Sequence, residues 1–92
     1  MKEQVSCHAV FKGNVHGVGF RYTSGNIARS LGLKGFVRNL SNGDVELGVE
    51  GERAVIERFL SELDDAMGGY IKTKEITWSE FKSEYSDFRI TH

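Results

Sequence analysis

A glycine-rich stretch near the N-terminus carries the residues best suited to bind an anion. Glycines stand at positions 13, 17 and 19, directly after an alternating apolar segment, and Arg21 follows where a helical pattern begins. Glycine lets successive backbone N–H groups turn toward one point, and a helix N-terminus adds a partial positive charge there. The guanidinium of Arg21 can donate paired hydrogen bonds to two oxygens of one anion. The stretch therefore predicts a site for a phosphate or carboxylate group.

This stretch matches neither of two common nucleotide-binding motifs. No Gly-Lys-Ser/Thr follows it, as a P-loop requires, and Tyr22 stands where the dinucleotide fingerprint needs its third glycine. On spacing alone, the same residues also fit a glycine-rich turn followed by a solvated arginine in the first turn of a helix. Both interpretations stay open at the level of spacing.

The cysteine and the histidines indicate neither a disulfide nor a metal site. Cys7 is the single cysteine, which excludes an intrachain disulfide and favours a reducing, cytoplasmic location. Strand alternation places Cys7 on a core face, where a thiol acts as a small apolar group. The three histidines are scattered without the spacing of metal ligands. We therefore expect no metal and no cofactor.

Hydrophobic periodicity predicts the elements that must position Arg21. Alternation from Val5 to Phe11 is typical of a strand with one face on the core. Helical spacing runs from Phe20 to Leu31, and Gly32 follows as a natural stop. Arg21 is thus expected in the first turn of a helix that a strand and a glycine-rich loop precede.

The second half of the chain predicts a hairpin, a helix and two further strands. In chain order we expect strands at 34–39 and 44–50, a helix from Glu52 to Met67, a strand around 70–81 and a short strand through Phe88 and Ile90. Asn42-Gly43 is the hairpin signal, because both residues tolerate positive φ. The order β-α-β-β-α-β, with a short extra C-terminal strand, predicts an α+β, ferredoxin-like sandwich. We expect one domain over residues 1–92, with an antiparallel sheet and two helices on one face.

Two motifs in the exact residues resemble the signatures of the acylphosphatase family. The first is Gly-x-Val-x-Gly-Val-Gly-Phe-Arg at 13–21, and the second is Gly-Phe-Val-Arg-Asn at 35–39, with Val-Glu following at 45–46. The segment 84–90 also resembles the closing strand of that family. The resemblance spans nearly the whole chain. It implies the same ferredoxin-like fold that periodicity predicts.

The resemblance also implies an activity and a set of site residues. The activity is metal-independent hydrolysis of the carboxyl–phosphate bond of small acyl phosphates, giving a carboxylate and inorganic phosphate. Arg21 and Asn39 would be the catalytic pair, with Arg21 on the phosphoryl group and Asn39 on the attacking water. The implied phosphate-binding loop residues are Val15, His16, Gly17, Val18, Gly19 and Phe20.

Two positions depart from the pattern of the family. His16 stands where the family usually carries glutamine, and Phe36 stands where it often carries tryptophan. Neither departure removes a group to which the family assigns catalysis. The change at His16 bears either on the pH response of the loop or on its outer contacts.

Composition bears on the other classes of function. The chain of 92 residues has a net charge of −1, so its overall field favours neither a nucleic acid nor an anionic membrane as partner. A ferredoxin-like RNA-binding domain would need paired aromatic residues and a basic face. No apolar run approaches the length of a membrane span.

We expect a monomer acting on a small acyl phosphate, and the alternative is a non-catalytic module of the same fold that binds phosphate or carboxylate.

Overall fold

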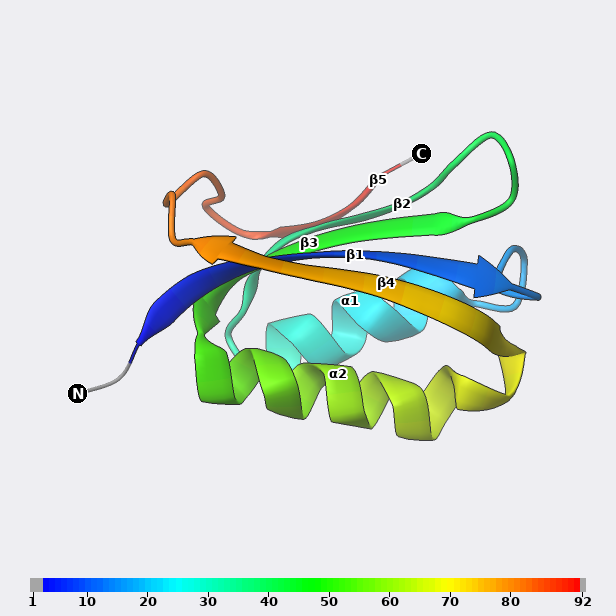
Figure 1. Ribbon diagram of the computed structural model, residues 1–92, viewed down its shortest axis with the longest axis horizontal. Helices are drawn as coiled ribbons and strands as arrows, with labels where there is room; N and C mark the ends of the chain where they lie inside the picture. The colour runs from blue at the N-terminus through cyan, green and yellow to red at the C-terminus, as the bar shows by residue number, and fades with distance from the viewer. Residues whose placement is uncertain (1–2, 92) are drawn as a thin grey trace.

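The computed structural model describes residues 3–91 and has two layers, one of strands and one of helices (Figure 1). The strands are β1 (Gln4–Gly13), β2 (Lys34–Asn39), β3 (Val45–Glu52), β4 (Ile71–Glu80) and β5 (Phe88–Thr91). The helices are α1 (Phe20–Ser30) and α2 (Arg53–Met67), and a 3₁₀ turn, η1 (Gly68–Tyr70), follows α2. Both helices lie on one face of the sheet. The predicted ferredoxin-like element order is confirmed.

The strand order in the sheet is β4-β1-β3-β2-β5. Pairing is antiparallel between β1 and β3, β1 and β4, and β2 and β3, whereas β5 pairs with β2 in parallel. The predicted antiparallel sheet is confirmed for β1 to β4, and the short extra strand β5 adds a parallel pair, so the five-stranded sheet as a whole is mixed. The reason is topological. The end of β4 and the start of β2 lie at the same end of the sheet, and the chain crosses the sheet there (Figure 1). A strand that then pairs with β2 must run in the same direction as β2.

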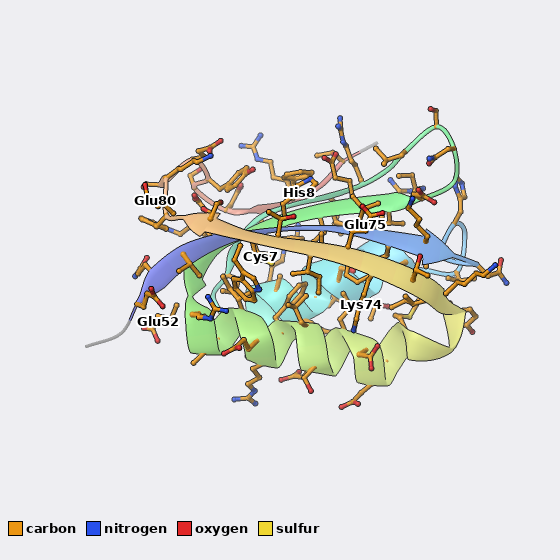
Figure 2. The ribbon with its side chains drawn as sticks, viewed as in Figure 1. Cys7, His8, Glu52, Lys74, Glu75 and Glu80 are labelled. Atoms are coloured by element: carbon orange, nitrogen blue, oxygen red, sulfur yellow. The ribbon has the colours of Figure 1, made fainter. Side chains whose placement is uncertain are left out.

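Alternation along the strands separates a core face from an open face. The side chains of Val5, Cys7, Ala9 and Phe11 in β1 are buried toward the helices. Figure 2 shows Cys7 on this face and His8 on the other. Burial raises the pKa of the Cys7 thiol to about 11, so the thiol is a packed neutral group at physiological pH.

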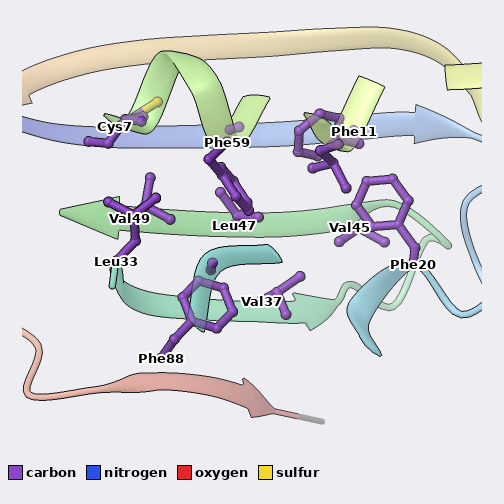
Figure 3. Packing of buried hydrophobic residues seen from close by; sticks show 14 of the residues in the cluster. Cys7, Phe11, Phe20, Leu33, Val37, Val45, Leu47, Val49, Phe59 and Phe88 are labelled. Atoms are coloured by element: carbon purple, nitrogen blue, oxygen red, sulfur yellow. The ribbon is translucent and has the colours of Figure 1, made fainter. Parts of the chain in front are cut away.

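The core brings the start of α1 against the sheet. The rings of Phe11 in β1 and Phe20 in α1 lie 5.1 Å apart between centroids (Figure 3). Val37, Val45 and Leu47 are fully buried beside them. Such packing fixes the first turn of α1 relative to β1 and β2, which is what a site at that end of the sheet requires.

Gly32 ends α1 as predicted. Its φ is 71°, its N–H donates to Arg29 O at 3.1 Å, and the Leu33 N–H donates to Ala28 O at 2.9 Å. This pair of bonds is the Schellman motif, which needs a residue with positive φ at that position.

The hairpin between β2 and β3 is also confirmed, but its turn differs from the predicted one. Gly43 has a φ of 93°, and Asn42 does not have a positive φ. The Gly43 N–H donates to Leu40 O at 3.1 Å, and the Leu40 N–H donates to Asp44 O at 2.7 Å, which is the pattern of a three-residue loop with a glycine bulge. Asn42 contributes through its side chain instead, because its Oδ1 accepts a 3.0 Å hydrogen bond from the Asp44 N–H.

Candidate active site

The glycine loop, residues 14–19, joins the end of β1 to the start of α1. Gly17 and Gly19 have φ values of 77° and 78°, and a Cβ on either would have no neighbour within 4 Å. The backbone conformation, and not a lack of space, therefore requires glycine at both positions. The Asn14 N–H donates to Tyr70 O at 2.9 Å, which ties the start of the loop to η1.

The N-terminus of α1 has no group of its own to neutralise it. Gly19 is the N-cap residue, no side chain caps the helix, and its first turn contains no acidic residue. The first N–H groups of a helix have no partner within the helix, and the helix dipole places a partial positive charge there. The start of α1 is thus suited to an anionic ligand.

Arg21 projects from this first turn and is held against the last strand. Its side chain is half-buried, and Nη1 donates to Thr91 O in β5 at 2.8 Å. A guanidinium carries five N–H donors in a planar fork, so this bond fixes the orientation of the fork.

Asn39 reaches the same region from the end of β2. It lies two residues after Val37, which is fully buried, so alternation places both side chains on the helix-facing side of the sheet. The side-chain hydrogen bonds of the following turn are made by Asn42 and Asp44. The half-buried Asn39 is therefore not the residue that holds this turn.

One cavity of about 300 Å³ brings most of the predicted site together. It is lined by Val15, His16, Gly17, Gly19, Phe20, Arg21, Tyr22, Asn39 and Ile90. The remaining predicted loop residue, Val18, does not line the cavity, and its side chain packs against the hydrophobic core, so its predicted role through the backbone N–H stays a prediction. Its neighbours Gly17 and Gly19 turn the chain so that Val18 faces inward.

Sequence reasoning missed two residues that line the cavity and one that supports it. Tyr22 lines the cavity, although 68% of its surface is exposed. Its position directly after Arg21 was the one signal in the sequence that could have placed it in the site. Ile90 and Thr91 belong to β5. Ile90 stands opposite Val37 in the parallel register, which could be known only once β5 was placed beside β2.

Residues 3–91 contain neither a metal-ligand cluster nor a membrane-spanning helix. No three residues among His, Cys, Asp and Glu lie close enough to hold a metal ion. No helix in this range is both long and apolar enough to cross a membrane.

Comparison with known proteins places the chain in a family. The family model described as Acylphosphatase matches residues 7–90. A protein named Acylphosphatase from Ligilactobacillus salivarius is 38% identical over 81 residues, covering 87% of this chain and 90% of that protein.

Solved structures agree in fold. The crystal structure of acylphosphatase from Bacillus subtilis superimposes with a TM-score of 0.87 at 25% identity, covering 96% of this chain and 99% of the other. A full-length HypF structure in a phosphate- and nucleotide-bound form has a TM-score of 0.81 at 29% identity. The match covers all of this chain and 12% of HypF. The chain belongs to the acylphosphatase family, and hydrolysis of acyl phosphates is the activity that this membership assigns to it.

Proposed function

We propose that this chain hydrolyses small acyl phosphates in the cavity at the start of α1, with Arg21 and Asn39 as its catalytic residues. The observation that carries the proposal is the cavity itself. It joins a glycine loop, an uncapped helix N-terminus and Arg21 to Asn39, which comes from a different strand.

The chemistry of the substrate explains why such a simple site suffices. An acyl phosphate is a mixed anhydride, and its leaving group is a carboxylate that is stable as an anion near neutral pH. A strong general acid is therefore unnecessary. The reaction needs donors around the phosphoryl oxygens and a water held in line with the breaking P–O bond.

In the proposed mechanism, Arg21 and the backbone N–H groups from Val15 to Phe20 bind the phosphoryl oxygens. The guanidinium and the helix dipole stabilise the charge as it redistributes in the transition state. The hydrogen bond from Arg21 to Thr91 O supports this role, because a guanidinium held in one orientation loses less entropy when it binds an anion.

Asn39 holds the attacking water through its side-chain amide. An amide is not a strong base, so the proton of the water passes to a phosphate oxygen of the substrate. The water oxygen bonds to phosphorus, the bond to the acyl oxygen breaks, and a carboxylate and inorganic phosphate leave. A pH profile showing a sharp dependence on an ionisable protein base would contradict this step.

Two tests with matched controls address the assignment. We expect Arg21→Ala and Asn39→Ala each to lower kcat/KM for a simple aryl-acyl phosphate by at least about 100-fold, the usual cost of losing one oriented donor in a site. Arg58→Ala in α2, where Arg58 is exposed and paired with Glu62, and Asn26→Ala on the exposed face of α1 serve as controls. If wild type shows no turnover, or the two site variants match their controls, the assignment fails.

The alternative is a module that binds phosphate or carboxylate without turnover. The fold match to 12% of the much longer HypF shows that this architecture also occurs within larger proteins. Stabilisation of the chain by inorganic phosphate, with no phosphate release from acyl phosphates, would favour the alternative.

We propose further that residues 1–92 form one domain that acts as a cytoplasmic monomer without a nucleic-acid or membrane partner. The single buried thiol supports a reducing compartment. The large exposed apolar side chains come from three separate segments: Tyr22 from α1, Tyr70 from η1 and Phe81 from the loop after β4. Light scattering that gives the mass of a dimer would contradict the monomer.

A further inference from the structure

Glu50 is the one charged residue among residues 3–91 that is buried, with 4% of its surface exposed. It lies in β3, and alternation with the buried Val49 places its side chain on the open face of the sheet. Burying a carboxylate costs free energy unless hydrogen bonds compensate it. Its surroundings should therefore contain a set of donors arranged for it.

Those donors come mainly from the closing loop, residues 81–87, which crosses the sheet between β4 and β5. Glu50 Oε1 accepts hydrogen bonds from the backbone N–H groups of Glu84 at 2.9 Å and Tyr85 at 3.4 Å. Oε2 accepts from the Lys82 N–H at 3.1 Å and from Ser6 Oγ at 3.0 Å. Each carboxylate oxygen thus has two partners.

The loop is shaped around this carboxylate. Ser83 has a φ of 53°, the one positive φ at a residue other than glycine among those described. A left-handed residue within a short run of N–H donors turns them toward one point, as in anion-binding nests. Burial would raise the pKa of the Glu50 carboxyl, but the hydrogen bonds from Ser6 and the loop outweigh it and hold the pKa below its usual value.

The closing loop sets the position of β5. The Gly35 N–H donates to Asp87 O at 2.9 Å, and the Phe88 side chain that follows is buried in the core. Arg29 in α1 donates to Phe88 O from Nη2 at 3.0 Å and from Nε at 3.3 Å. The edge strand is therefore fixed at its beginning by the loop and by α1.

The other end of β5 contacts the catalytic arginine. Thr91 O accepts the 2.8 Å bond from Arg21 Nη1, and Ile90 lines the cavity. α1 lies directly against β5, because a Cβ on Gly25 would come within 2.7 Å of Ile90 Cδ1. A shift of this four-residue strand along β2 would move the carbonyl that orients Arg21.

We propose that Glu50 is a positioning residue for the reaction: by gathering the closing loop it holds β5 in register, and β5 in turn orients Arg21 toward the phosphoryl group. This inference rests on the proposed role of Arg21. It assigns a function to the segment 84–90, which the catalytic mechanism leaves unused.

The experiment compares phosphate binding and turnover in variants of the full chain. We expect Glu50→Gln to raise the inhibition constant of inorganic phosphate and to lower kcat/KM by about tenfold, since a displacement well under 1 Å suffices for such a loss. Ser6→Ala removes a single hydrogen bond from the carboxylate and should shift both quantities in the same direction by a smaller factor. It also keeps the test valid if Glu50→Gln folds poorly.

Glu46→Gln is the matched control. Glu46 lies on the same strand and the same face, but its partners are His8 and Arg38, and it does not contact the closing loop. We expect kcat/KM and the phosphate inhibition constant of this variant to lie within about twofold of the wild-type values, because surface ion pairs contribute little to the fold.

A second comparison separates positioning from general destabilisation. Arg21→Lys removes the guanidinium fork. In that background, Glu50→Gln should lower kcat/KM by less than about a further twofold, because the effects of two substitutions are not additive when one residue acts through the other. Full additivity there would overturn the proposal. The proposal would also be overturned if Glu50→Gln and Ser6→Ala kept the wild-type phosphate inhibition constant and kcat/KM, even with a lowered thermal stability.

Failure of the proposed function has a different signature. Wild type would then show no turnover, or Arg21→Ala would retain the activity of its control Arg58→Ala, whatever Glu50 does.

Discussion

The glycine loop and the closing loop lie at opposite ends of the sheet, and they differ in what they face. The glycine loop at one end borders an open cavity with Arg21 and Asn39. The closing loop lies at the other end of the sheet (Figure 1). Three of its backbone N–H groups donate hydrogen bonds to the buried carboxylate of Glu50. The proposed phosphate site thus lies at one end of the molecule, and the other end is occupied by an anion of its own.

The difference shows how a small chain can keep the groups proposed for catalysis and the contacts that stabilise the fold in separate regions. Donors satisfied by a buried carboxylate add to the stability of the fold. Donors left facing a cavity contribute little to folding and act on a ligand instead. Variants at the two ends should therefore separate stability from activity.

The largest effect expected is the contrast in stability between Glu50→Gln and Asn39→Ala. A glutamine amide would set N–H groups against the loop donors, so we expect a loss of about 2 kcal/mol in the free energy of unfolding. Asn39→Ala should change it by less than about 0.5 kcal/mol, because Asn39 does not hold the turn that follows it. Urea denaturation followed by circular dichroism measures both. Equal losses in the two variants would remove the distinction between the two ends.

An intermediate effect is expected at Gly19 in the glycine loop. Gly19→Ala forces an alanine to a φ of 78° with no steric neighbour, so the cost is conformational and about 1 kcal/mol. Because Gly19 borders the cavity, activity should fall by about tenfold, more than the stability loss alone explains. Gly69→Ala in η1, also without a neighbour within 4 Å, is the control and should retain wild-type activity. An active Gly19→Ala variant would show that the loop conformation is not required.

The fold was largely predictable from the sequence, because periodicity and turn residues act locally. The start of α1 at Phe20 and its stop at Gly32 were predicted correctly, and the strand at 34–39 was predicted with its observed bounds. The parallel pairing of β5 was not, because it depends on where the crossing loop returns to the sheet. The alternating hydrophobic residues Phe88 and Ile90 indicate a strand, but they do not indicate which strand of the sheet it pairs with.

The site was predictable to the extent that its residues are adjacent in sequence. The glycine loop and Arg21 form one stretch, and Asn39 came from the family resemblance. Ile90 and Thr91 could not be found in this way, because their place beside Val37 and Arg21 follows from the parallel pairing. The burial of Glu50 was likewise not predictable, since a glutamate in an alternating strand normally faces solvent.

A smaller effect concerns acid stability. The pKa of Glu50 is lower in the folded chain than in the unfolded one, so its contribution is present above the unfolded value of about 4.3 and is lost as pH falls through the folded pKa. The pKa of Glu46 is also lowered, chiefly by its hydrogen bond with His8, and this contribution adds to the acid sensitivity. Below about pH 5, Glu50→Gln should lose stability less steeply than wild type. Thermal melts between about pH 3 and 7, a range that brackets the unfolded pKa of about 4.3, measure how steeply the stability of each protein falls with pH. Parallel slopes would contradict the assignment of a charged, buried Glu50.

The central claim is that the cavity at the start of α1 binds the phosphoryl group through the glycine loop and Arg21, with Asn39 beside it. A crystal structure with bound orthophosphate tests it most directly. We expect the anion in this cavity, contacted by backbone N–H groups of the glycine loop and by the Arg21 guanidinium, with the Asn39 amide facing it. A phosphate bound elsewhere, or one bound in the cavity with Arg21 turned away, would contradict the claim.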